Sequence, residues 1–273
     1  MSELVSYAPI IVMMLAIGAF AGVLAGLLGV GGGIVLVPAF FYTFTALGYG
    51  GPYVMQLCVA TSLATIVVTS LRSAASHHKR GAVDWALLKR LSPGIVVGSF
   101  VGVAVASAVE SAALQALFGV LGVVIGLYLG FGNPDWKLAD DMPHGAKGAG
   151  LSGLIGMLSV LLGIGGGSLA VPTMSLAGYP IHRAVATGSG FGVVLAVPSA
   201  ISFMFLEIPP EYLPPMTIGA VNIPAFLIVI AMTIFTAPLG ARLAHSMDPK
   251  PLRRVFAVFL VLVALNMLRE LLF

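Results

Sequence analysis

The sequence GLLGVGGGIVLVP covers residues 26–38, and a close copy, VLLGIGGGSLAVP, covers residues 160–172. Each copy places three consecutive glycines between apolar stretches and ends in a proline five residues after the last glycine. Glycine adopts backbone angles that other residues avoid, so such a run predicts a tight bend. We therefore expect a helix, a bend and a second helix in each copy.

The composition indicates lipid as the main solvent. Of the 273 residues, 59% are hydrophobic and only 8% are charged, and the mean hydropathy is +1.08. A soluble domain is about 45–50% apolar and about 25% charged. So few charges cannot cover a water-facing surface, whereas apolar runs of about 20 residues match the thickness of a bilayer. The sequence predicts an all-α polytopic membrane protein whose partner is the lipid bilayer.

The composition also argues against several kinds of site. The net charge of +3 comes without a basic face rich in aromatic residues, so no nucleic-acid partner is expected. Cys58 is the single cysteine and lies in an apolar run, where a buried core residue is expected. We find no HExxH motif, no paired intramembrane carboxylates and no catalytic cluster at membrane depth. We therefore expect no catalytic residue, no metal and no cofactor.

The apolar runs form two groups of five around a polar segment. VATSL at 59–63 corresponds to VATGS at 185–189, and GAVD at 81–84 corresponds to GAVN at 219–222, which indicates an internal duplication. The predicted organisation is repeat one at 1–131, a cytoplasmic linker at 132–148 and repeat two at 149–273. The runs themselves are 8–30, 34–47, 53–71, 91–109, 112–131, 149–163, 168–178, 184–206, 217–245 and 252–272.

The basic residues change place between the two groups. They lie between the third and fourth runs of the first group, and between the fourth and fifth runs of the second. Because loops rich in Lys and Arg face the cytoplasm, the repeats are predicted to insert with opposite orientations. This layout puts both termini outside the plasma membrane and all 13 Lys and Arg residues except Arg269 on the cytoplasmic side.

The second run of each group is too short to cross a bilayer. Residues 34–47 and 168–178 form helices of about 21 and 16 Å, against a hydrocarbon core of about 30 Å. A bend that starts a helix exposes unpaired N–H groups at the positive end of the helix dipole, which binds anions without a basic side chain. Two inverted copies would bring two such ends together near the midplane. The predicted substrate-binding glycines are Gly31, Gly32, Gly33, Gly165, Gly166 and Gly167.

The alternative is that these glycines only let helices pack closely. Glycine stripes at four-residue spacing elsewhere in the chain, such as Gly18, Gly22 and Gly26 or Gly98 and Gly102, are expected to serve this purpose.

Hydroxyl groups near the glycine phrases are candidate donors to an oxyanion. Thr61 and Ser62 lie in the third run, Thr187 and Ser189 lie at matching places in the eighth, and Ser168 follows the second phrase. The alternative is that each hydroxyl bonds a carbonyl of its own helix.

A few polar residues lie at the ends of runs. His182 and Arg183, with Gln56 at the corresponding place of the first repeat, are candidates for the entrance. For Arg183 the favoured interpretation is an anchor at the cytoplasmic interface, and the alternative is that it draws anions toward the inner mouth. Asp84 and Asn222 are expected to cap helices, and the adjacent His77 and His78 are expected to face water.

The paired glycine phrases, with ATS at 60–62 and ATGS at 186–189, resemble the sulfite exporter family TauE/SafE over almost the whole chain. Members of this family are multi-pass permeases of the bacterial plasma membrane, linked to export or uptake of sulfite, thiosulfate and organosulfonates. The resemblance implies that the substrate is a small sulfur oxyanion or a sulfonate. The residues alone indicate a small anion.

These observations predict a secondary transporter (permease) that moves a small anion by alternating access around a midplane site. A channel-like anion pore is the alternative, because the sequence does not separate gated diffusion from alternating access. A membrane enzyme or assembly factor is less favoured. No Asp or Glu lies deep in an apolar run, which disfavours a carboxylate proton relay. The sequence predicts neither the transport direction, nor the coupling ion, nor the oligomeric state.

Overall fold

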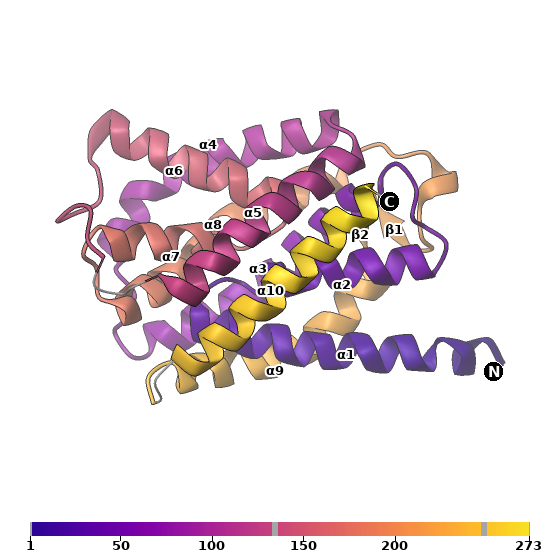
Figure 1. Cartoon of the computed structure of the whole chain (residues 1–273), viewed down its shortest axis with the longest axis horizontal. Coiled ribbons are helices and arrows are strands. Elements are labelled where there is room, and N and C mark those ends of the chain that lie inside the picture. Colours follow the sequence, from indigo (N-terminus) through magenta and orange to yellow (C-terminus); the bar gives the residue numbers. More distant parts are fainter. Residues whose placement is uncertain (1, 133–135, 247–249, 273) are drawn as a thin grey trace.

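The computed structural model describes residues 2–132, 136–246 and 250–272, so part of the predicted linker lies outside the described residues (Figure 1). Within these ranges the chain is almost entirely helical. The helices are α1 (Ser2–Leu28), α2 (Gly33–Ala46), α3 (Val54–His78), α4 (Trp85–Ala108), α5 (Ser111–Phe131), α6 (Gly145–Leu161), α7 (Gly167–Leu176), α8 (Ile181–Met204), α9 (Ile223–Leu243) and α10 (Lys250–Leu272), with a 3-10 turn, η1 (Pro210–Tyr212), and two short strands, β1 (Thr217–Ile218) and β2 (Val221–Asn222).

Six of the described helices are long and apolar enough to cross a bilayer, namely α1 from Ala8, α3, α4, α5, α8 and α9. Helix α2 has 14 residues and α7 has 10. At 1.5 Å per residue they reach only about 21 and 15 Å. The chain is therefore a multi-pass helical membrane protein in which some helices stop inside the thickness of the bundle.

The helices pack in pairs that join the two ends of the sequence. Helix α1 lies along α9 on one side of the bundle, and α4 lies along α6 on the opposite side (Figure 1). Helix α5 packs along α10, while α3 packs along α8. Helices α3 and α8 are largely buried, so they form the centre of the bundle.

Glycines set the spacing of two of these pairs. A Cβ atom at Gly26 of α1 would overlap the carbonyl oxygen of Ala237 in α9, and one at Gly98 of α4 would overlap that of Gly153 in α6. The helices therefore touch backbone to backbone, which small residues permit inside a membrane. The packing role predicted for these glycine stripes is confirmed.

Side-chain caps decide where two helices begin. The Oδ1 atom of Asp84 accepts a hydrogen bond from the amide of Leu87 at 3.0 Å, and the Oδ1 atom of Asn222 accepts one from Ala225 at 3.0 Å. Both predicted caps are confirmed. Helix α4 therefore starts at Trp85, ahead of the predicted run at 91.

The predicted run 217–245 is wrong as one continuous segment. Thr217 pairs with Asn222 and Ile218 with Val221 in an antiparallel hairpin, and the helix starts only at Ile223. Apolar composition alone does not distinguish a short hairpin from the first turns of a helix.

We expect Gly98→Ala to lower the free energy of unfolding by about 1–3 kcal/mol, because its methyl group would push α4 away from α6. Thermal unfolding of the purified protein in detergent measures the effect. Gly150→Ala is the matched control, because a Cβ atom at this helical position meets no atom within 4 Å. Equal stability of the two variants would contradict the close packing of α4 on α6.

Candidate functional site

Two glycine turns interrupt the helices near the centre of the bundle. The first glycine turn, residues 29–33, joins α1 to α2, and the second, residues 163–167, joins α6 to α7. In the first turn Gly29, Gly31 and Gly32 have φ of 69°, 75° and 83°. In the second, Gly163 has φ of 61°. Side-chain-bearing residues rarely adopt these left-handed angles, so glycine allows the chain to leave the helix here.

The two glycine turns touch each other through their backbones. A Cβ atom at Gly167 would overlap the carbonyl oxygen of Gly29, and one at Gly33 would overlap that of Gly163. A Cβ atom at Gly31 would lie 3.0 Å from the Cα of Gly165. Since Gly29 matches Gly163 and Gly33 matches Gly167 in the aligned phrases, these contacts are reciprocal. Close backbone approach therefore explains why both phrases are so rich in glycine.

The amides of these turns are buried and unpaired. In the described ranges, the N–H groups of residues 31–33 and 165–167 have no hydrogen-bond acceptor, and all of these residues are buried. An unpaired buried N–H costs free energy comparable to a lost hydrogen bond. The N-termini of α2 and α7 add partial positive charge at the same place. The arrangement supplies what a small anion binds, namely several donors and a positive potential without a basic side chain.

Two of the predicted serine ligands tie the turns to other elements. The Oγ of Ser62 in α3 donates to the carbonyl of Gly163 at 2.7 Å. The Oγ of Ser168 in α7 donates to the carbonyl of Val30 at 3.1 Å. Each serine therefore links one half of the chain to a glycine turn of the other half. The single hydroxyl hydrogen of each serine is already donated to a backbone carbonyl.

The predicted threonine ligands, Thr61 and Thr187, make a matching pair of bonds. The Oγ1 of Thr61 accepts from the amide of Asn222 at 3.0 Å, and the Oγ1 of Thr187 accepts from the amide of Asp84 at 3.0 Å. Each threonine thus holds the residue that caps a helix of the opposite half. A hydroxyl that accepts in this way keeps its own hydrogen to donate.

Three serines meet between α3 and α8. Ser189 donates to the carbonyl of Val185 at 3.2 Å, and its Oγ lies 2.9 Å from that of Ser73. Ser70 is buried, and its Oγ has no hydrogen-bond partner among the described residues. That Oγ lies 3.3 Å from the position that a Cβ atom of Gly31 would occupy. Ser70 is therefore a free hydroxyl beside the first glycine turn.

Ser70 and Ser73 were not among the predicted ligands. Ser73 had a signal in the sequence, because Ser62, Thr65, Thr69 and Ser73 recur at three- or four-residue spacing and place hydroxyls along one face of α3. Ser70 lies outside this series.

The residues predicted at the entrance lie in different surroundings. His182 and Arg183 are exposed at the start of α8, where Nη2 of Arg183 pairs with Oδ2 of Asp84 at 3.1 Å. Gln56 is only 2% exposed, and its Nε2 donates to the carbonyl of Val109 at 2.9 Å. The structure therefore places Gln56 beneath the end of α4 and leaves the two α8 residues in contact with solvent.

His77 was expected to face water, and this expectation is wrong. Its side chain is fully buried, with Nε2 at 3.0 Å from the carbonyl of Gly26 and Nδ1 at 3.1 Å from Nε2 of His245. Gly26 lies in the last turn of α1, where carbonyls lack helical partners. His77 supplies the missing partner. Burial, together with the charges of Arg80 and His182, lowers the pKa of His245.

The chain matches the family Sulfite exporter TauE/SafE over residues 14–267. It belongs to this family. The TauE/SafE chain is 32% identical over 259 residues to a probable membrane transporter protein of Haemophilus influenzae, covering 94% of this chain and 97% of the relative.

Two further relatives carry the same description. A probable membrane transporter protein of Methanocaldococcus jannaschii is 29% identical, with 94% of each chain covered. One of Bacillus subtilis is 27% identical, with 95% of this chain and 97% of the relative covered. No solved structure matches the chain. Family and relatives together make this TauE/SafE chain a multi-pass membrane transporter.

We expect Thr61→Val to lower the free energy of unfolding by about 1–3 kcal/mol, because it leaves the buried amide of Asn222 without an acceptor. Thr187→Val is expected to act in the same direction through Asp84. Thr61→Ser keeps the hydroxyl and serves as the control in thermal unfolding. A valine variant as stable as the serine variant would show that the bond to Asn222 contributes nothing.

Proposed function

We propose that this TauE/SafE protein is a secondary transporter that moves a small anion, a sulfur oxyanion or an organosulfonate, across the plasma membrane. The observation that carries the proposal is the contact between the two glycine turns, with their buried and unpaired amides. The family description supplies the sulfur chemistry.

Reciprocal contacts support two repeats of inverted topology. Helix α1 packs on α9 as α6 packs on α4, and Thr61 holds Asn222 as Thr187 holds Asp84. Contacts that exchange in this way are what we expect if an approximate two-fold axis relates residues 1–131 to 149–273. In this proposal α1–α2 and α6–α7 are Gly-rich broken-helix hairpins that enter the membrane from opposite sides and meet at its midplane.

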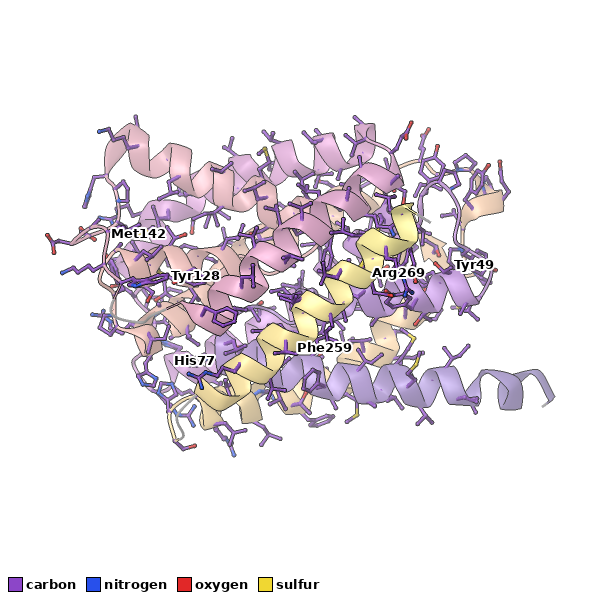
Figure 2. The ribbon with its side chains drawn as sticks, viewed as in Figure 1. Tyr49, His77, Tyr128, Met142, Phe259 and Arg269 are labelled. Carbon is purple, nitrogen blue, oxygen red and sulfur yellow. The ribbon has the colours of Figure 1, made fainter. Side chains whose placement is uncertain are left out.

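The distribution of charge supports an orientation. Both chain ends lie at one end of the bundle (Figure 1), where Tyr49 and Arg269 also lie, whereas His77 and Met142 lie at the other end (Figure 2). The basic residues between positions 72 and 80 lie on either side of His77, in the last turns of α3 and in the loop that follows it. Because loops rich in Lys and Arg face the cytoplasm, our proposal has the two termini outside.

The site would hold the anion by dipoles rather than by ion pairs. The amides of residues 31–33 and 165–167 would donate to the anion's oxygens, with the spare hydrogens of Thr61, Thr187 and Ser70 available nearby. Such donors favour an anion over a cation, yet they release the anion more readily than a buried lysine or arginine would. A transporter needs this balance, because tight binding would prevent release.

The close contact of the two turns favours alternating access over an open pore. The turns meet backbone to backbone, so an anion crossing between them requires one hairpin to move relative to the other. Glycine-bounded segments that join rigid helices absorb such movements at low cost.

Flux into proteoliposomes tests the proposal. We expect saturable transport of sulfite or thiosulfate or a short organosulfonate, with slower transport of acetate, and with a rate that changes when a pH gradient or membrane potential is imposed. A linear, non-saturating flux would indicate a channel-like pore. No flux of any sulfur anion would contradict the proposed substrate class.

We expect Ser70→Ala to weaken anion binding about 10- to 150-fold while the protein remains folded, because loss of one hydrogen bond to a charged group costs about 1.5–3 kcal/mol. Titration calorimetry with sulfite or thiosulfate measures the affinity. Ser152→Ala is the matched control, since Ser152 is equally buried but donates only within its own helix. If both variants bind like the unmodified protein, Ser70 does not touch the anion.

A further inference from the structure

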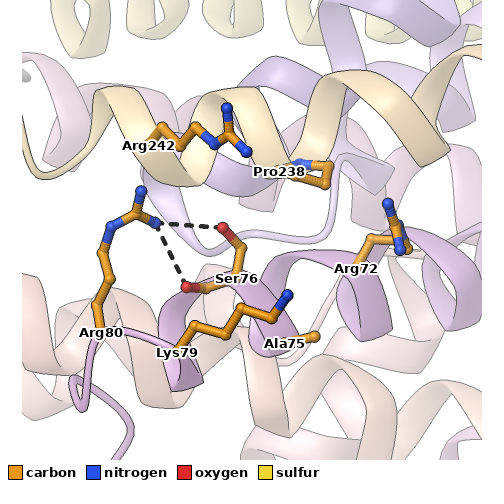
Figure 3. Close-up of a pocket in the computed structure, with 7 residues that line it drawn as sticks. All are labelled: Arg72, Ala75, Ser76, Lys79, Arg80, Pro238 and Arg242. Atoms are coloured by element: carbon orange, nitrogen blue, oxygen red, sulfur yellow. Dashed lines mark hydrogen bonds between the residues drawn. The ribbon is translucent and has the colours of Figure 1, made fainter.

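A polar cavity lies away from the glycine turns, between the ends of α3 and α9. Its volume is about 380 Å³. It is lined by Arg72, Ala75, Ser76, Lys79, Arg80, Pro238 and Arg242 (Figure 3). The cavity is therefore lined by four cationic side chains and by no acidic one.

These cations lack acidic partners in the described part of the chain. None of them forms a salt bridge there, whereas Arg90, Lys137 and Arg183 each pair with an aspartate. Arg80 donates to the carbonyl and the Oγ of Ser76 at 3.3 and 3.2 Å, which bends its side chain back over α3 (Figure 3). Four like charges around one cavity repel each other unless an anion lies between them.

Pro238 explains the position of Arg72, which lies in α3 ahead of the helix end that carries Lys79 and Arg80. Proline has no N–H, so the carbonyl of Ile234, four residues earlier in α9, loses its helical partner. The Nε of Arg72 donates to this carbonyl at 3.2 Å. This bond holds the guanidinium against α9 at the wall of the cavity and leaves its terminal nitrogens free to donate to a ligand.

The rim of the cavity continues into lipid-facing surface. Leu71 beside Arg72 is 51% exposed, and Phe235 and Leu239 on either side of Pro238 are 68% and 48% exposed. Large apolar side chains left open on a membrane helix contact acyl chains. The cavity therefore opens at the boundary between hydrocarbon and headgroups, at the end of the bundle rich in Lys and Arg.

We propose that this cavity binds a phosphate group, as carried by an anionic phospholipid headgroup of the cytoplasmic leaflet. Guanidinium groups match phosphate oxygens with two parallel hydrogen bonds, and lysine adds a point charge. Basic pockets between membrane helices suit such headgroups. Free phosphate shares this chemistry, so the experiment separates the two sources. The proposal does not depend on the transported anion.

The test is a thermal-unfolding titration of the purified protein in detergent with phosphatidylglycerol, phosphatidylcholine or inorganic phosphate. A ligand that binds only the folded protein raises its unfolding temperature. We expect phosphatidylglycerol to do so and phosphatidylcholine not to. In the double variant Lys79→Gln with Arg242→Gln, the apparent affinity for phosphatidylglycerol should fall about tenfold or more, because two charged donors are lost.

The matched control is Lys89→Gln with Lys147→Gln, which removes the same charge from exposed residues outside the cavity. The single variants Lys79→Gln and Arg242→Gln replace the double variant if it unfolds. If only inorganic phosphate raises the unfolding temperature, and the cavity variants lose this effect, the site is upheld and its ligand is free phosphate. If the control variant loses as much affinity for phosphatidylglycerol as the cavity variants, the proposal is overturned. Normal binding of phosphatidylglycerol by the cavity variants also overturns it.

Discussion

The contact on which the structure depends is between two stretches of backbone. Gly167 meets the carbonyl of Gly29, and Gly33 meets that of Gly163, so closely that no side chain fits at either place. Because the chain must leave the helix on both sides of this contact, amides are left unpaired in a buried environment. Irregular backbone at membrane depth is tolerated only where protein or a polar cavity covers it. Here each glycine turn covers the other, so neither half of the chain completes this centre alone.

The polar contacts around the glycine turns also join one half of the chain to the other. Ser62 bonds the second glycine turn and Ser168 bonds the first, while Thr61 and Thr187 hold the caps of α9 and α4. These bonds fix the position of the turns without placing a full charge beside them. An anion there would be held by dipoles, whereas the basic residues gather at the bundle end near α3 and α9. The proposed anion site and the cluster of basic side chains are thus at separate places.

Much of the fold could be predicted because it depends on local sequence and on composition. The apolar runs, the glycine breaks and the caps at Asp84 and Asn222 need only length, φ preference and a side-chain oxygen. The burial of His77 could not be predicted, because it depends on a carbonyl of α1 that is distant in sequence. Ser70 was missed for a similar reason, since nothing local shows which face of α3 meets a turn. The anion site itself stays a prediction.

Anomalous diffraction from crystals grown with selenite tests the central claim most directly, because selenium then replaces the sulfur of sulfite and can be located. This claim predicts a selenium peak beside the contact of the two glycine turns, with oxygens about 3 Å from amides of residues 31–33 and 165–167. A peak only in the cavity beside Arg72, or a well-ordered peak elsewhere in the bundle, would contradict it.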